Sequence, residues 1–201
     1  MNHKRFTISP KELWELFTAW IILSIAFAIL YANNDFSFFL IAFPVSIVAV
    51  GLGFVLHELG HKYLAQRYGL GAVFRANYQG LFFAILISFT GFILVAPGAV
   101  HLHGRRILRE QHGKISLMGP LMNLFLALAF LMLYLMPFPK PPLIDLTAVL
   151  GFRINTWIGL FNLIPVSPFD GLGIKKWSLP VYLMMVLLVG TLFFSSYLVN
   201  I

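Results

Sequence analysis

Long uncharged stretches dominate the pattern of hydrophobic and polar positions along this chain. A helix that crosses a membrane needs about 20 consecutive, mostly apolar residues, and six stretches are long enough to consider. They cover residues 13–31, 36–56, 80–100, 115–136, 146–164 and 179–199. Glu15 lies near the start of the first stretch, and Arg153 interrupts the fifth. The pattern therefore predicts a polytopic α-helical membrane protein.

The third stretch, residues 80–100, differs from the others because it is rich in glycine and proline. Gly and Pro at this density argue against one regular helix. If this stretch does not cross the membrane, 12 of the 14 Lys and Arg residues share one side with the amino terminus. If it crosses, the basic residues within 105–114 move to the other side. Since Lys and Arg concentrate in cytoplasmic loops, we expect five transmembrane helices plus a membrane-embedded or re-entrant strand-like segment.

The same distribution predicts the orientation of the chain in the cell membrane. We expect a multi-pass protein whose amino terminus is cytoplasmic and whose carboxyl terminus is external. The net charge of +7 follows from the basic loops of such a protein, so we expect the lipid bilayer as a partner and no nucleic acid.

Composition narrows the class of protein further. The chain is 60% hydrophobic and 10% charged, whereas soluble domains carry about 25% charged residues. Too few charges are present to cover a globular surface, which excludes a soluble enzyme, and the hydrophobicity excludes a disordered chain. The absence of cysteine excludes disulfides, thiolate metal sites and a cysteine nucleophile.

The second stretch leads into the sequence HELGH at residues 57–61. Two histidines four residues apart lie on one face of a helix, so both imidazoles can reach one ion. Glu58 lies on the neighbouring face, where it can accept a proton from water without being a ligand. This is the arrangement of zinc hydrolases, which add a third protein ligand and an open position. The motif predicts His57 and His61 as zinc ligands and Glu58 as the catalytic base.

Few acidic residues could supply the third ligand. Asp35 and Asp145 fall on the far side of the membrane in the five-helix topology, and Glu110 lies in a basic loop. Asp170 follows the fifth stretch, on the same side as HELGH, within the sequence NLIPVSPFDG at residues 162–171. Prolines there break the helix and can aim a carboxylate into a cavity, although an aspartate before glycine is also a common turn residue. This placement favours Asp170 as the third ligand.

These motifs together resemble the site-2 protease family of intramembrane zinc metalloproteases. HELGH and NLIPVSPFDG match the two metal-binding motifs of that family, and GPLMN at residues 119–123 matches its GPxxN motif. The resemblance covers roughly residues 50–175, and Phe169 stands where the family usually has leucine. It implies a single integral-membrane protease domain over residues 1–201, with its core at about 38–175 and no inserted PDZ-like domain.

The resemblance also implies roles for individual residues. His57, His61 and Asp170 would bind one zinc ion per chain, and Glu58 would act as base and then as acid. Asn162 and Asn123 would support the substrate or the oxyanion. The third stretch would present a strand edge to an extended substrate. The expected activity is hydrolysis of peptide bonds in membrane-spanning proteins near the cytoplasmic face.

Two alternatives remain open at this stage. A prenyl-protein type of membrane metalloprotease also uses HExxH, but its third ligand is a later glutamate, and only Glu110 follows HELGH. A non-enzymatic metal-binding membrane protein or ion carrier would need a second cluster of intramembrane polar residues. Arg153 is a candidate functional charge within a span, although we favour its pairing with carbonyl groups or with Asn155.

Overall fold

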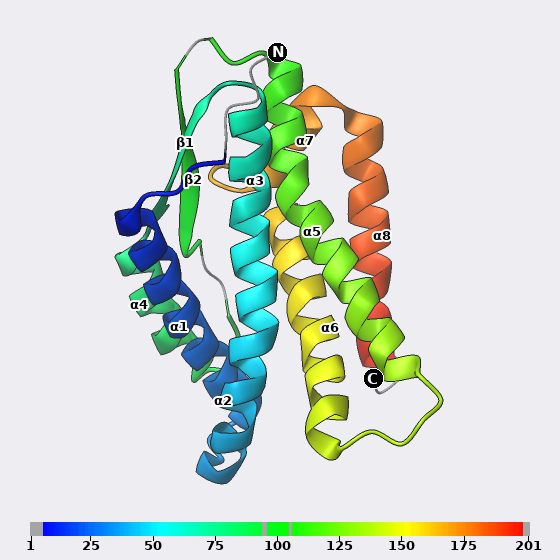
Figure 1. The fold of residues 1–201 in the computed structure, drawn as a ribbon. Helices are drawn as coiled ribbons and strands as arrows, with labels where there is room; N and C mark the ends of the chain where they lie inside the picture. The colour runs from blue at the N-terminus through cyan, green and yellow to red at the C-terminus, as the bar shows by residue number, and fades with distance from the viewer. Residues whose placement is uncertain (1–5, 94–95, 105, 199–201) are drawn as a thin grey trace.

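The protein is mostly helical and carries one small sheet (Figure 1). The computed structural model describes residues 6–93, 96–104 and 106–198. Its helices are α1 (Pro10–Ala32), α2 (Phe36–Val50), α3 (Leu56–Arg67), α4 (Tyr78–Ser88), α5 (Arg109–Leu135), α6 (Pro142–Asn162), α7 (Asp170–Trp177) and α8 (Leu179–Leu198), and its strands are β1 (Gly71–Ala76) and β2 (Gly98–His103). Three basic residues used in the topology argument lie outside the described residues: Lys4, Arg5 and Arg105.

When α2 and α3 are taken as one continuous helix, the described residues contain five helices that are long and apolar enough to cross a membrane, which is the predicted number. One of them joins α2 and α3 through a π-helical turn, Gly51–Val55, into a continuous helix of 32 residues. At 1.5 Å per residue this helix is about 48 Å long, whereas the hydrocarbon core of a bilayer measures about 30 Å. The HELGH sequence occupies the last third of this helix and therefore lies toward one end of the bundle.

The third apolar stretch forms a short helix followed by a strand, so the expectation of a strand-like segment over residues 80–100 needs correction. Helix α4 has 11 residues, or about 16 Å, which is too short to cross the hydrocarbon core. Asn77 caps its amino-terminal end, where the Asn77 side chain accepts a hydrogen bond from Gly80 N at 3.0 Å. Only the last residues of the stretch, from Gly98 onward, are extended; residues 94–95 lie outside the described ranges.

Strands β1 and β2 form an antiparallel pair that the apolar pattern did not predict, because β1 falls in a stretch assigned to a loop. Ala76 at the end of β1 is opposite Gly98 at the start of β2, and Asn77 N donates to Pro97 O at 2.8 Å. The two ends of the segment between the strands therefore lie at one level of the molecule, and none of the five span-length helices falls within this segment.

Carboxylates of α1 hold the outer edge of β1. Phe74 N donates to Glu12 Oε1 at 3.0 Å, and Lys62 Nζ on α3 donates to the same oxygen at 2.6 Å. Ala76 N donates to Glu15 Oε2 at 3.0 Å. Glu12 and Lys62 are almost completely buried. These bonds tie the sheet to α1 and to the helix that carries HELGH.

The charge within α6 is held by the last described turn of α8. Arg153 Nη2 donates to Ser196 O at 3.3 Å, and its guanidinium carbon lies 5.4 Å from the centre of the Tyr197 ring. The expected carbonyl partner is therefore present. Asn155, the other expected partner, instead donates to Gly151 O and accepts a hydrogen bond from Asn123.

Candidate metal centre

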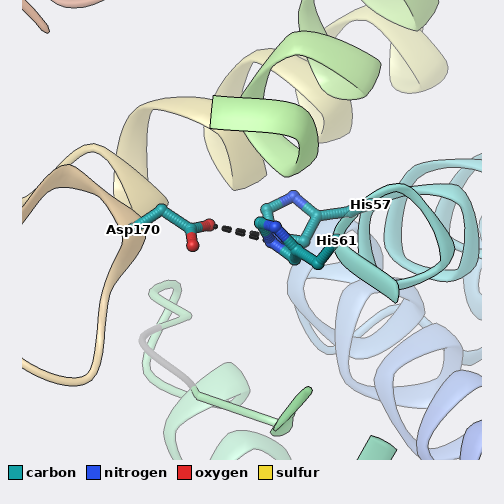
Figure 2. A group of neighbouring side chains, drawn as sticks. All are labelled: His57, His61 and Asp170. Carbon is teal, nitrogen blue, oxygen red and sulfur yellow. Dashed lines mark ion pairs between the residues drawn. The ribbon is translucent and has the colours of Figure 1, made fainter. Parts of the chain in front are cut away.

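Three side chains from two distant parts of the chain meet in one group (Figure 2). His57 and His61 lie one turn apart on α3, and Asp170 is the first residue of α7. Asp170 Oδ2 lies 3.2 Å from Nε2 of each histidine. The three possible ligand atoms all lie within 4.8 Å of one another. The structure thus brings together the three residues that the motifs indicated.

The hydrogen bonds behind the two imidazoles define which nitrogen faces the centre. His61 Nδ1 lies 2.7 Å from Ile115 O, and a carbonyl oxygen only accepts hydrogen bonds. His61 Nδ1 therefore carries the hydrogen, and in the neutral ring the Nε2 lone pair is free to bind a metal ion held between this nitrogen and Asp170. His57 Nδ1 lies 2.7 Å from Asn123 Oδ1, which gives the same arrangement. Such bonds are characteristic of metal-binding histidines.

The donor set fits a zinc ion. Two imidazole lone pairs and a carboxylate oxygen converge on one point, and this concentration of electron density needs a positive charge between the three groups. Two histidines and one carboxylate, with a further position open, form a common donor set of catalytic zinc sites. The residues present therefore match the metal that the motifs predicted.

Asp170 is placed by the irregular segment between α6 and α7. Phe169, directly before it, packs edge-to-face against Phe161 of α6, with ring centres 4.7 Å apart. Burial raises the pKa of the Asp170 carboxyl, but when no metal is bound a protonated His61 and hydrogen bonds from both imidazoles outweigh burial and hold this pKa at about 2. Asp170 is therefore ionised at neutral pH, as a metal ligand must be.

Gly119 of α5 provides the space for the two imidazoles. A Cβ atom added to Gly119 would lie 2.5 Å from His57 Nε2 and would also overlap the His61 ring. Only glycine lets α5 approach α3 this closely at the level of the metal ligands. Gly119 begins the GPLMN motif, and sequence reasoning assigned it no function because the contact is made between two helices.

A cavity of about 360 Å³ opens beside the three ligands. Glu58, which is 6% exposed, lies in its wall next to His57 and His61. Strand β2 contributes Gly98, Ala99, Val100 and Leu102 to the same wall. The cavity therefore holds a carboxylate beside the metal ligands and a strand along its side.

The two asparagines predicted to support the substrate occupy different positions. Asn162 lines the cavity, and its Nδ2 donates one hydrogen bond to Ile158 O at 3.0 Å. Its second amide hydrogen is thus available to a ligand in the cavity. Asn123 is 0% exposed and lies behind His57. Its position favours orientation of the imidazole over contact with a substrate.

Relatives of this chain are named as zinc metalloproteases. It is 38% identical over 174 residues to "Putative zinc metalloprotease MJ0611" of Methanocaldococcus jannaschii. The matched region covers 86% of this chain and 87% of that protein. It is 27% identical to "Zinc metalloprotease MJ0392" of the same organism, over 81% of this chain and 40% of that protein. It is 29% identical to "Putative zinc metalloprotease YwhC" of Bacillus subtilis, over 64% of this chain and 66% of that protein. No family model and no solved structure matches the chain.

Proposed function

Because this chain belongs to the zinc metalloprotease family of MJ0611, we propose that it is an intramembrane endopeptidase of the site-2 protease type. It hydrolyses peptide bonds of membrane-spanning proteins near the cytoplasmic face. The observation that carries this proposal is the position of the metal centre. His57, His61 and Asp170 meet beside Glu58 at one end of a bundle of span-length helices.

The residues of the cavity supply the parts of a peptide hydrolysis reaction. A zinc ion bound by His57, His61 and Asp170 supplies Lewis acidity toward the scissile carbonyl and the attacking water. The Glu58 carboxylate accepts the proton of that water and returns it to the leaving amide nitrogen. The free amide hydrogen of Asn162 donates to the substrate or to the developing oxyanion.

The free edge of β2 suits an extended substrate. On β1, Phe74 and Ala76 direct their N–H groups outward to the carboxylates of α1. Their partners in the register are Val100 and Gly98, so antiparallel alternation directs the backbone groups of these two residues away from β1. Both line the cavity. A substrate segment that has unwound from its helix pairs with this edge, and its scissile bond then lies beside Glu58.

The orientation follows from the basic residues at the end of the bundle that holds the metal centre. Lys175 and Lys176 lie in the last turn of α7, and Arg109 is the first residue of α5. Lys140 lies in the connection between α5 and α6, at the opposite end. By the positive-inside rule the metal centre faces the cytoplasm, the amino terminus is cytoplasmic and the carboxyl terminus is external.

The decisive experiment measures zinc content and cleavage on the same samples. The wild-type chain, Glu58→Gln and Asp170→Asn are reconstituted in liposomes with a library of single-span reporter proteins. The wild type should cleave a subset of reporters. Glu58→Gln should retain zinc and lose about 10²–10⁴-fold in rate, because it removes the proton acceptor but no ligand. Asp170→Asn should lose both zinc and activity, since it weakens a ligand.

Two outcomes would contradict the proposal. Cleavage at the wild-type rate by zinc-loaded Glu58→Gln would refute the role of this carboxylate. Zinc binding without cleavage of any reporter would favour a non-enzymatic metal-binding membrane protein or ion carrier.

The structure gives little support to either alternative function. Among the described residues, a single group of three or more His, Asp or Glu side chains is placed to hold a metal. Glu110, the ligand that a prenyl-protein type of enzyme would need, pairs with Lys114 on the surface.

A further inference from the structure

A chain of hydrogen bonds extends from His57 into the interior of the bundle. His57 Nδ1 lies 2.7 Å from Asn123 Oδ1. Asn123 Nδ2 donates to Gly53 O and to Asn155 Oδ1, at 3.1 Å in each case. Asn155 Nδ2 in turn donates to Gly151 O at 2.9 Å. Asn123 and Asn155 are both 0% exposed, so water cannot replace any of these bonds.

The direction of each of these hydrogen bonds follows from the two backbone carbonyl oxygens that accept from the asparagines, Gly53 O and Gly151 O. Gly151 O only accepts, so the amide nitrogen of Asn155 faces it and Asn155 Oδ1 faces Asn123. Two acceptors, Asn155 Oδ1 and Gly53 O, then face the Asn123 nitrogen, which leaves Asn123 Oδ1 toward His57. The His57 Nδ1 atom must therefore carry its hydrogen, and His57 Nε2 presents a lone pair to the metal centre.

The backbone at Gly53 accommodates this series of hydrogen bonds. Gly53 lies in the π-helical turn directly before α3, and π-turns occur frequently at functional sites. A Cβ atom at Gly53 would lie 2.7 Å from Asn155 Oδ1, so any side chain there would displace the amide. The same residue thus provides an acceptor for Asn123 and the space for Asn155.

We propose that Asn155 is a positioning residue of the zinc site, which acts through Asn123 to fix the orientation and the protonated nitrogen of His57. Without Asn155 Oδ1, the Asn123 amide can rotate and present its nitrogen to His57. After that rotation an N–H of Asn123 would face the N–H of His57 Nδ1. The imidazole then favours the form in which Nδ1 accepts and Nε2 carries the hydrogen, and a protonated Nε2 cannot bind a metal. Asn155 does not line the cavity, and its hydrogen bonds lead to His57 only through Asn123, so its effect on zinc is transmitted by Asn123.

The test measures zinc affinity by competition with a chromogenic chelator in detergent. Asn155→Leu should weaken zinc binding by about 10–100-fold, the usual cost of losing an outer partner of a metal-binding histidine. Thr156→Val is the matched control. Thr156 is also buried and on α6, but its hydroxyl donates only to carbonyls of its own helix, Phe152 O and Arg153 O. This control should retain wild-type affinity.

Two further measurements separate positioning from a general loss of structure. Gly53→Ala removes no polar group but displaces the Asn155 amide, so it should weaken zinc binding as well. Because Asn155 acts through Asn123, adding Asn155→Leu to Asn123→Ala should cause no further loss of affinity. Wild-type zinc affinity in either Asn155→Leu or Gly53→Ala, whichever folds, would overturn the inference, as would full additivity in the double variant.

The inference rests on the zinc site of the proposed function but not on proteolysis. Zinc binding that depends on Asn155, without cleavage of any reporter, would refute the protease and leave this role intact. Cleavage by the wild type, with unchanged zinc affinity in Asn155→Leu, would refute this role and leave the protease intact.

Discussion

At the scale of single residues, the absence of a side chain at Gly119 matters as much as the ligands themselves. A Cβ atom at this position would overlap the rings of His57 and His61. Gly119→Ala should therefore displace both imidazoles and strongly reduce the zinc content of the purified protein, while the five long helices remain intact. Gly190→Ala on α8 is the control, because its Cβ would meet only Leu160 Cδ1 at 3.9 Å. Equal zinc content in the two variants would show that α5 does not constrain the centre.

The two histidine ligands were recognisable in the sequence because their spacing places both side chains on one face of a single helix. HELGH places two imidazoles on one face whatever surrounds it. Asn155 and Gly119 carry no such local signal. Their importance depends on what lies opposite them, respectively Asn123 and the two imidazoles.

At the scale of elements, the sheet is attached to α3, the helix that carries HELGH, through a buried ion pair. Lys62, the residue after His61, donates to Glu12 Oε1 of α1 and to Ala72 O of β1. Removal of one partner of a buried pair costs about 3–5 kcal/mol, because a buried charge remains without compensation. Lys62→Met should therefore lower the thermal unfolding temperature clearly, and Glu12→Gln in the same chain should restore part of the loss.

The matched control for this prediction is the exposed pair of Glu110 and Lys114, which lie one turn apart on α5. Lys114→Met should leave the thermal unfolding temperature nearly unchanged, as is usual for exposed pairs within a helix. If Lys62→Met were no more destabilising than Lys114→Met, the buried pair would not hold the sheet. A double variant no more stable than Lys62→Met would point to the lost bond to Ala72 O as the main cause.

At the scale of the whole molecule, the topology predicts which loops share the side of the metal centre. Natural cysteine is absent, so single cysteines report one site each. A cysteine at His103, on β2, should be protected from an impermeant thiol reagent in intact cells. A cysteine at Phe138, which is exposed in the connection between α5 and α6, should react. Reaction at His103 with protection at Phe138 would invert the orientation proposed here.

The sequence by itself determined the long helices and, through HELGH, two of the three residues of the candidate metal centre. Apolar runs of about 20 residues must satisfy their backbone hydrogen bonds internally in a bilayer, so composition alone predicts span-length helices. The five helices found agree with this prediction. The basic loops predicted that HELGH and Asp170 share one side of the membrane, and the prolines before Asp170 favoured this residue as the third ligand.

Only the tertiary structure decided which short elements and buried polar side chains pack against those helices. Strand β1 is six residues long, too short for its own pattern to be distinguished from a loop, and its edge is held by carboxylates from α1. Likewise, Asp170 reaches His57 and His61 only because α7 packs against α5 and α5 against α3. Short elements and buried polar contacts obtain their stability from partners far away in the sequence. Local pattern therefore cannot specify them, whereas a long apolar helix is specified by its own residues.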